Sequence, residues 1–515
     1  MASEPSLTEN RNTISNSIWQ IDQEDWLVDN SIVLKEPVEF RSNYGTSLSG
    51  IDTFTLETQG KDMFYDYHNA YLEYSCQIDK GKGSTGLTDI NIALVNCSAS
   101  LWDNAELYLD NAKVERQEFP GTSVLMRTLV EETKERMDTV GPAEFWYPDS
   151  HPQGPEFYND GATGGVLSTT TASGSSPLTT GNIADNDASG WYPRGDDKKI
   201  QFFKANNADK DMSNIRENPH YNPGYVERLQ RCMTVTGQSG ATSVNVKLRL
   251  SDLFGFLRSY KKAMRGPRLQ VKLVRNRDPG RLLYGDFGTG RKISVAPKVE
   301  LTKLVLMVPE VQPNYQTMSM LSEKLASGAQ VRHLYAHSEL FYRNSLTPST
   351  GENNYLLPTS PSRPLRAYIG FKSVNRRLHI STNYQQFDAF DLESITMKVN
   401  GVQYPRENMS LNLSDKSQRD VIRALEALHQ CGAKAGGDNG GALVDYKTWT
   451  QTYPIFCIDM EHMAIDTLLK NRSSVLDLRW KFRTAPSTDY DLFILLQSEK
   501  EVRLDLISSA VRVRS

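Results

Sequence analysis

His333 and His337 have the spacing that comes nearest to a metal site in this 515-residue chain. On a helix, two histidines four positions apart would turn their imidazoles to one side, as zinc ligands do. The segment VRHLYAHSELFYRN, however, alternates in the manner of a β-strand, and no third ligand is evident. No H-x-H pair occurs among the eight histidines. We therefore predict no metal ligand and no cofactor.

Two further patterns match catalytic motifs only in part. The segment GDFGTGRK at 285–292 has the glycines of a phosphate-binding loop, but Arg, Lys and Ile follow the last glycine in place of a Lys-Ser/Thr pair. The Asp-Phe-Gly triplet at 286–288 matches a kinase motif, yet the chain has no H-R-D catalytic loop. The acidic pair Glu131 and Glu132 is typical of a helix surface. We predict a glycine-rich turn at 285–292, no catalytic residue and no enzyme.

A run of basic residues stands above the background of the sequence. Its members are Arg258, Lys261, Lys262, Arg265, Arg268, Lys272, Arg275 and Arg277. The 258–277 segment could face DNA or an acidic neighbour, and Arg512 and Arg514 could add to such a surface. The formal net charge is only -4, however, so the chain lacks the general positive field of a DNA-coating protein. We favour a solvated loop followed by the outward face of one strand.

The cysteines and the amino-terminal segment indicate a reducing compartment. Five cysteines are scattered along the chain, and none belongs to a C-x-x-C motif: Cys76, Cys97, Cys232, Cys431 and Cys457. This pattern argues against a disulfide framework and against a zinc site. The segment MASEPSLTEN lacks the features of a signal peptide, and no stretch is long and apolar enough to span a bilayer. We expect synthesis in the cytosol and no transmembrane segment.

The periodicity of the chain predicts an all-β protein. In SVNVKLRL (243–250), LQVKLV (269–274) and VLDLRWKF (475–482), apolar and polar residues alternate with a period of two, as in a strand with one buried face. Helices are expected only at 122–138, at 414–430 and at 315–325. The second of these has a capping box at Asp415 and Gln418. A chain of this length suits two large β domains.

Each half of the chain has the same succession of elements. A hairpin at 106–115, around Asp110-Asn111, corresponds to one at 395–404, around Asn400-Gly401. In both halves a helix follows, and then a strand, a connection and a second strand, which we expect to be neighbours, at 246–276 and 455–483. The offset between the copies changes within each half, which indicates an insertion of about 80 residues in the first.

These observations predict two tandem eight-stranded jelly rolls with a few short helices in loops. The insertion is placed at 148–220, where Gly, Ser and Thr are too frequent to form a core. We predict an N-terminal arm at 1–48, a first jelly roll at 49–345 that carries the exposed insertion, and a second jelly roll at 346–515.

The ordered segments resemble those of a known family. The likeness rests on DMFYDYHNAYLEYSCQI (62–78), the hairpin around Asp110-Asn111, NPGYVERLQR, VKLRLSDLFGFLRSYKKAMRGPRLQVKLVRNRD, KVELTKLVLMVPEVQP, RAYIGFKSV, ITMKVNGVQYP and FILLQSEKEVRLD. In this order they resemble the double-jelly-roll major capsid proteins of eukaryotic DNA viruses and virus-like transposons. The Polinton (Maverick) and adintovirus type is the most similar, and virophage and giant-virus capsid proteins are more distant.

The resemblance implies a structural protein of the virion. Members of this family form pseudo-hexameric homotrimers that tile an icosahedral shell around double-stranded DNA, with outward loops as towers. The implied partners are neighbouring capsomers, penton proteins and minor or cement proteins, with DNA contact through 258–277 as an open question. The implied location is the virion capsid, after synthesis in the host cytoplasm and assembly in the nucleus or cytoplasm. Two alternatives stay open, a carbohydrate-binding tandem jelly roll and a host-domesticated binding protein derived from a capsid gene.

Overall fold

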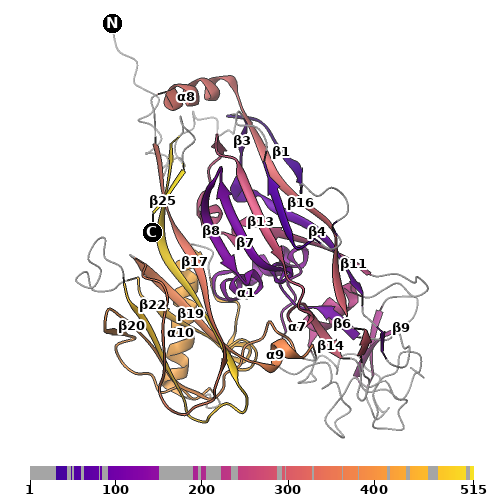
Figure 1. The fold of residues 1–515 in the computed structure, drawn as a ribbon, viewed down its shortest axis with the longest axis vertical. Helices are drawn as coiled ribbons and strands as arrows, with labels where there is room; N and C mark the ends of the chain where they lie inside the picture. Colours follow the sequence, from indigo (N-terminus) through magenta and orange to yellow (C-terminus); the bar gives the residue numbers. More distant parts are fainter. Residues whose placement is uncertain are drawn as a thin grey trace, which may run out of the picture.

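The computed structural model places most of the chain in two β-sheet units. It describes residues 31–42, 48, 51–58, 63–79, 82–83, 91–149, 190–194, 199–203, 222–232, 242–286, 293–295, 297–326, 330–361, 363–380, 382–413, 418–436, 441–461, 474–505 and 511–514. In Figure 1 the first unit runs from indigo to pink, and the second, in orange and yellow, lies beside it.

The first unit consists of two main sheets. One has the order β11 (Thr242–Arg249), β4 (Tyr71–Asp79), β16 (Lys298–Pro313), β3 (Phe64–Tyr65) and β12 (Met264–Arg265), with β1 (Ile32–Arg41) also paired to β16. The other has the order β2 (Thr53–Glu57), β13 (Leu269–Arg275), β7 (Trp102–Leu109) and β8 (Ala112–Glu118). In β13, buried and less buried residues alternate, so one face of the strand lies in the core.

The second unit repeats this plan. One sheet has the order β17 (Gln330–Leu346), β24 (Tyr490–Asp505), β19 (Pro364–Ser373) and β22 (Ile455–Asp459), with β25 (Val511–Arg514) also paired to β24. The other has the order β18 (Asn353–Leu356), β23 (Leu476–Phe482), β20 (Leu392–Val399) and β21 (Val402–Tyr404).

The two units match strand for strand. Along the chain β1, β2, β4, β7, β8, β11, β13 and β16 of the first unit correspond to β17 through β24 of the second, with the same neighbours in both sheets. This confirms the predicted fold of two tandem eight-stranded jelly rolls. One detail of the prediction is wrong, because β11 and β13 lie in opposite sheets and are not neighbours; the same holds for β22 and β23. The connection between each pair crosses from one sheet to the other.

Two strands lie on the other side of the predicted domain boundaries. β1 belongs to the first jelly roll, since it pairs with β16 from Ile32↔Pro313 to Arg41↔Val305, although we assigned its residues to the arm at 1–48. β17 opens the second jelly roll, since it pairs with β24 along nearly its whole length, although the predicted boundary at 345/346 leaves it in the first. β1 and β17 are each the first strand of a jelly roll and pair with its last main strand, β16 or β24. The local sequence therefore gives no sign of the pairing.

The hairpins and helices largely agree with the sequence. Asp110 (φ 52), Asn400 (φ 49) and Gly401 (φ 87) adopt the left-handed backbone that the two predicted turns require. The expected helix at 122–138 is instead two, α1 (Pro120–Glu131) and α2 (Lys134–Thr139), separated by the two extended residues Glu132 and Thr133. The helix expected at 414–430 is α10 (Arg419–Gly436), and Asp415 of its predicted capping box lies outside the described residues. The expected helix at 315–325 is α8 (Tyr315–Ala326), which follows β16 and precedes β17 in the chain.

Short elements complete the structure. They are η2 (Tyr67–Asn69), β5 (Lys82–Gly83), β6 (Asn91–Leu94), η3 (Ser98–Leu101), η4 (Gly141–Glu144), β9 (Gly190–Arg194), β10 (Lys199–Phe203), α4 (Pro223–Arg231), α5 (Leu250–Leu253), α6 (Gly255–Ser259), α7 (Pro279–Leu282), β14 (Leu283–Asp286), β15 (Ile293–Val295), α9 (Asn375–Leu378) and α11 (Tyr446–Gln451). Of these, β9 and β10 form a hairpin within the predicted insertion, most of which lies outside the described residues.

One cysteine pair departs from the sequence prediction. Cys431 in α10 and Cys457 in β22 form a disulfide, although the scattered cysteines had argued against one. Cys76, Cys97 and Cys232 are buried and form no disulfide within the part of the chain that the structure describes. The two bonded cysteines are 26 residues apart, and only the packing of α10 along β22 brings them together. The bond ties the helix to its own sheet within the second jelly roll.

Candidate functional site

The histidine pair lies on a strand, as the alternation of the segment predicts. In β17, His333 Nε2 is 2.8 Å from Ser259 Oγ, and His337 Nδ1 is 2.9 Å from Glu115 Oε1. His337 is buried, so its imidazole links the second jelly roll to β8 of the first. In the part of the chain that the structure describes, no group of three His, Cys, Asp or Glu residues could hold a metal ion.

The basic run does not form one surface. Arg258 turns to Glu131, with 2.6 Å between Nη1 and Oε2, and Arg268 pairs with Glu57 at 3.2 Å. Arg275 is buried and donates to the carbonyl of Val299. The expectation of a solvated loop and an outward strand face is therefore wrong for Arg258 and Arg275. Residues 287–292, most of the predicted glycine-rich turn at 285–292, lie outside the described residues.

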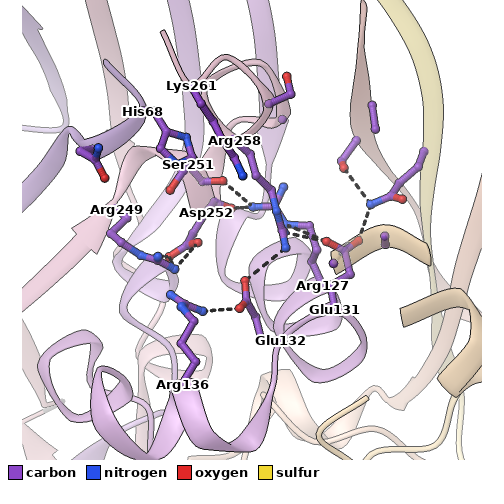
Figure 2. A pocket seen from close by; sticks show the side chains of 18 of the residues that line it. His68, Arg127, Glu131, Glu132, Arg136, Arg249, Ser251, Asp252, Arg258 and Lys261 are labelled. Carbon is purple, nitrogen blue, oxygen red and sulfur yellow. Dashed lines mark hydrogen bonds and ion pairs between the residues drawn. The ribbon is translucent and has the colours of Figure 1, made fainter. Parts of the chain in front are cut away.

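A charged cleft of about 620 Å³ lies between the two jelly rolls. α1 forms one wall, the turn through α5 and α6 another, and β17, β19, β24 and the end of α10 close the side of the second unit. Figure 2 shows arginine and carboxylate side chains of the first unit converging on it, among them Arg127, Glu131 and Arg258. We call this pocket the junction cleft.

Four arginines and four carboxylates form an ion-pair network at the junction cleft. Arg258 contacts Glu131 and Glu132, and Arg136 contacts Glu132 and Glu144. Arg249 lies 2.8 Å from Glu144 Oε1 and 2.7 Å from Asp252 Oδ1. Arg127 donates to the carbonyls of Ser251 and Asp252 and lies 3.9 Å from Glu131. Guanidinium groups suit such sites, because each offers several donors in a fixed plane.

Glu131 connects the two jelly rolls. Its side chain is only 2% exposed, and Arg258 of the first unit donates to it. From the second unit, the Tyr368 hydroxyl donates to Oε1 over 3.1 Å and Gln497 Nε2 over 2.6 Å. The prediction that Glu131 and Glu132 are ordinary surface charges is therefore wrong for Glu131. A buried carboxylate needs such donors, because an unpaired charge in a dry interior is strongly unfavourable.

Burial also alters the acidity of the neighbouring carboxyls. It raises the pKa of Glu144 to about 8, and the negative charge of Asp252 adds to this effect against the opposing influence of Arg136. Burial likewise raises the pKa of Asp252, although Arg136, Arg127 and Arg258 oppose it. The contact of Glu144 with Arg249 is thus not enough to offset its removal from water. The network binds protons at a pH where exposed carboxyls have lost them.

A buried lysine adds to the contacts between the units. Lys372 Nζ donates to the carbonyl of Tyr384 over 2.8 Å and to Thr122 Oγ1 of α1 over 3.4 Å. Burial, with Arg376 and Arg281 nearby, lowers its pKa well below the ordinary value. Sequence reasoning missed this residue, since one lysine in an apolar strand carries no visible pattern.

The two ends of the insertion are fastened together at its base. Asp149, where the chain leaves, and Arg228, where it has returned, form an ion pair of 2.7 Å between side chains with 0% exposure. Asn383 and Gln386 of the second jelly roll also donate to Asp149, and its backbone NH donates to the Tyr453 hydroxyl over 2.9 Å. The base of the insertion is therefore a rigid part of the contact between the jelly rolls.

The chemistry of this region is that of attachment. Each carboxylate that lines the junction cleft is engaged by an arginine. Within the described part of the chain, no helix is long and apolar enough to cross a membrane. Sequence reasoning could not find the network, because Glu131 and its partners Arg258, Tyr368 and Gln497 are more than 100 residues apart in the chain.

The paired sheets define a tandem jelly roll protein. The family model for the double jelly roll-like domain matches residues 230–490, just over half of the chain. The chain therefore belongs to the double jelly roll-like domain family. No curated protein matches its sequence.

Comparison with solved structures gives the same fold. A chain of the Sputnik virophage structure is 9% identical with a TM-score of 0.53, and the match covers 100% of this chain and 93% of that one. The Faustovirus major capsid protein is 8% identical with a TM-score of 0.50, covering 96% of this chain and 94% of that one. Similarity at this level of identity concerns the fold. Together, the family model and these neighbours show the double jelly roll fold.

Proposed function

We propose that this protein is a major capsid protein whose homotrimers tile an icosahedral shell around a double-stranded DNA genome. The observation that carries the proposal is the duplication of one eight-strand plan, with the same sheet order in both halves. Two similar units per chain give a trimer six, which suits a pseudo-hexameric tile. The similarity of nearly the whole chain to the Faustovirus major capsid protein supports this function.

Exposed apolar residues support contacts between subunits. Ile32, Val33 and Leu34 at the start of β1 are 36%, 69% and 39% exposed, and Tyr315 and Met320 of α8 are 91% and 53% exposed. Figure 1 shows α8 at one end of the molecule, above both units. Apolar side chains gathered in this way are typical of surfaces that another molecule covers. We assign this end to contacts within the trimer or with a neighbouring trimer.

The finer features of the function belong to the same proposal. The shell subunit would be of the Polinton or adintovirus type. Its two jelly rolls would correspond to residues 49–345 and 346–515, except that β1 joins the first and β17 the second. Its partners would be neighbouring capsomers, penton proteins and minor capsid or cement proteins, and it would reside in the virion capsid after synthesis in the host cytoplasm. The insertion at 148–220 would project as a tower. Any DNA contact through 258–277 would rest on the exposed members of that segment.

Light scattering on the purified chain tests the trimer. We expect a mass of about three times the 58.0 kDa of one chain, because repeated interfaces of standard size hold stable oligomers together. A strict monomer at high concentration would contradict the proposal and would favour a carbohydrate-binding tandem jelly roll. Such a protein would also have to bind glycans, which an array of oligosaccharides would reveal.

A further inference from the structure

The junction cleft holds more positive charge than its own carboxylates neutralise. The four arginines of the network face Glu131, Glu132, Glu144 and Asp252, so their charges are matched one to one. Three further cations line the cleft, namely Lys247, Lys261 and Arg366. Raised carboxyl pKa values, as found for Glu144 and Asp252, leave still less negative charge at neutral pH.

The two lysines lie on the side of the first jelly roll. Lys247 Nζ stands 4.0 Å from the ring centroid of Tyr71, a cation–π contact. Lys261 is exposed, and neither lysine has an ion pair with any residue that the structure describes. Figure 2 shows Lys261 above Arg258 at the cleft.

Arg366 provides the cation on the opposite side, from β19 of the second jelly roll. Its side chain is 8% exposed, and Nε is a buried donor without a hydrogen-bond partner among the residues that the structure describes. Nη1 donates to the carbonyl of Cys431 over 3.1 Å, while the contact of Nη2 with Glu461 spans 3.8 Å, longer than a charge-assisted hydrogen bond. A buried guanidinium nitrogen without an acceptor is unfavourable, so Nε is a donor that a bound anion would satisfy.

We propose that the junction cleft binds a small polyphosphate anion that contacts both jelly rolls at once. The volume of about 620 Å³ lies within the range of small-molecule sites, about 300–1,000 Å³. A linear polyphosphate carries several negative charges over a short length, so it can meet the lysines of one unit and the arginine of the other. Guanidinium and ammonium groups are the usual partners of phosphate oxygens. The ligand would add contacts between the two units to those that their own side chains make.

Isothermal titration calorimetry on the purified full chain tests this site at about 150 mM salt, where weak surface attraction is screened. The probes are inorganic tripolyphosphate, ATP and citrate. We expect saturable binding of tripolyphosphate at one site per chain. If ATP binds more tightly than tripolyphosphate, the ligand is a nucleotide. If the two bind with equal affinity, the site recognises only the phosphate chain. Citrate that binds as tightly as tripolyphosphate would contradict phosphate as the ligand class.

Matched lysine variants locate the binding. Lys247→Ala combined with Lys261→Ala should weaken tripolyphosphate binding by about tenfold or more, because it removes two charged contacts. Lys262→Ala is the control, since this exposed neighbour does not line the cleft. The affinity of this variant for tripolyphosphate should equal that of the wild type. Arg366→Gln should also weaken binding, provided that its circular dichroism spectrum matches that of the wild type.

The absence of saturable binding would overturn the proposal, as would an equal effect of the Lys262→Ala control. Because the test uses binding to the purified chain, it does not depend on shell formation. The trimer and the cleft ligand can therefore fail separately.

Discussion

At the scale of residues, the contact between the jelly rolls contains buried ion pairs. Arg228 and Asp149 have no exposed side-chain surface, and Asn383 and Gln386 complete the donors around the carboxylate. Such a pair gains little over an apolar contact when it is intact, but it is strongly unfavourable when one partner is removed. The surface ion pairs of the same protein have no comparable effect, because water replaces a lost partner.

Arg228→Met should destabilise the protein by about 3–5 kcal/mol, because it leaves the buried Asp149 carboxylate without its cation. The thermal midpoint, followed by differential scanning calorimetry, should fall by several degrees. Arg268→Met is the control, since its side chain is 48% exposed in the pair with Glu57, and it should cost at most about 1 kcal/mol. Equal losses in the two variants would show that the buried pair has no special role.

Glu144 gives the protein a pH-dependent stability. Its pKa rises from 4.5 in the unfolded chain to about 8 in the folded state, so the folded protein holds a proton that the unfolded chain releases. This contribution is fully present below about pH 4.5 and is lost as the pH rises towards 8. We expect the thermal midpoint of the wild type to fall between pH 5 and pH 8 by more than that of Glu144→Gln. Parallel pH profiles for the two proteins would contradict this assignment.

At the scale of elements, α1 is packed so tightly against α10 that a side chain is excluded between them. A Cβ on Gly432 in α10 would lie 2.0 Å from the carbonyl oxygen of Val130 in α1. These are the equivalent helices of the two jelly rolls, each of which follows the hairpin of its unit. The close approach brings Glu131, the next residue of α1, to its partners in the second unit.

Gly432→Ala should destabilise the protein by about 1–3 kcal/mol, because the two backbones would have to move apart. In an ordinary helix interior the same change stabilises, so a loss would point to the helix contact itself. Gly441→Ala is the control, since a Cβ there would meet nothing within 4 Å, and its stability should change little. Chemical denaturation gives the free energy of unfolding of both variants and of the wild type. A Gly432→Ala variant as stable as the wild type would contradict the close approach of the two helices.

The sequence predicted the elements better than their contacts. The hairpins around Asp110 and Asn400 depend on adjacent residues, so a local pattern suffices to find them. β1 was assigned to the N-terminal arm and β17 to the first jelly roll, because each is paired with a strand that lies at the far end of its own jelly roll. The disulfide of Cys431 and Cys457 and the buried network of Glu131 were missed for the same reason. Only the folded chain brings those residues together.

At the scale of the whole molecule, the two jelly rolls form one unit with a rigid contact and exposed apolar residues at one end. Buried pairs at the insertion base and at the junction cleft hold the halves in a single orientation. A tile with pseudo-sixfold shape needs this rigidity, since small errors in orientation would accumulate around a closed shell. Tyr315 of α8 and the start of β1 remain available for other chains.

Electron microscopy of the expressed protein tests the proposed shell subunit most directly. We predict particles or flat arrays built from trimers with a nearly hexagonal outline, in which each trimer shows six similar lobes. Isolated single chains at every protein concentration, or an assembly without threefold symmetry, would contradict the account.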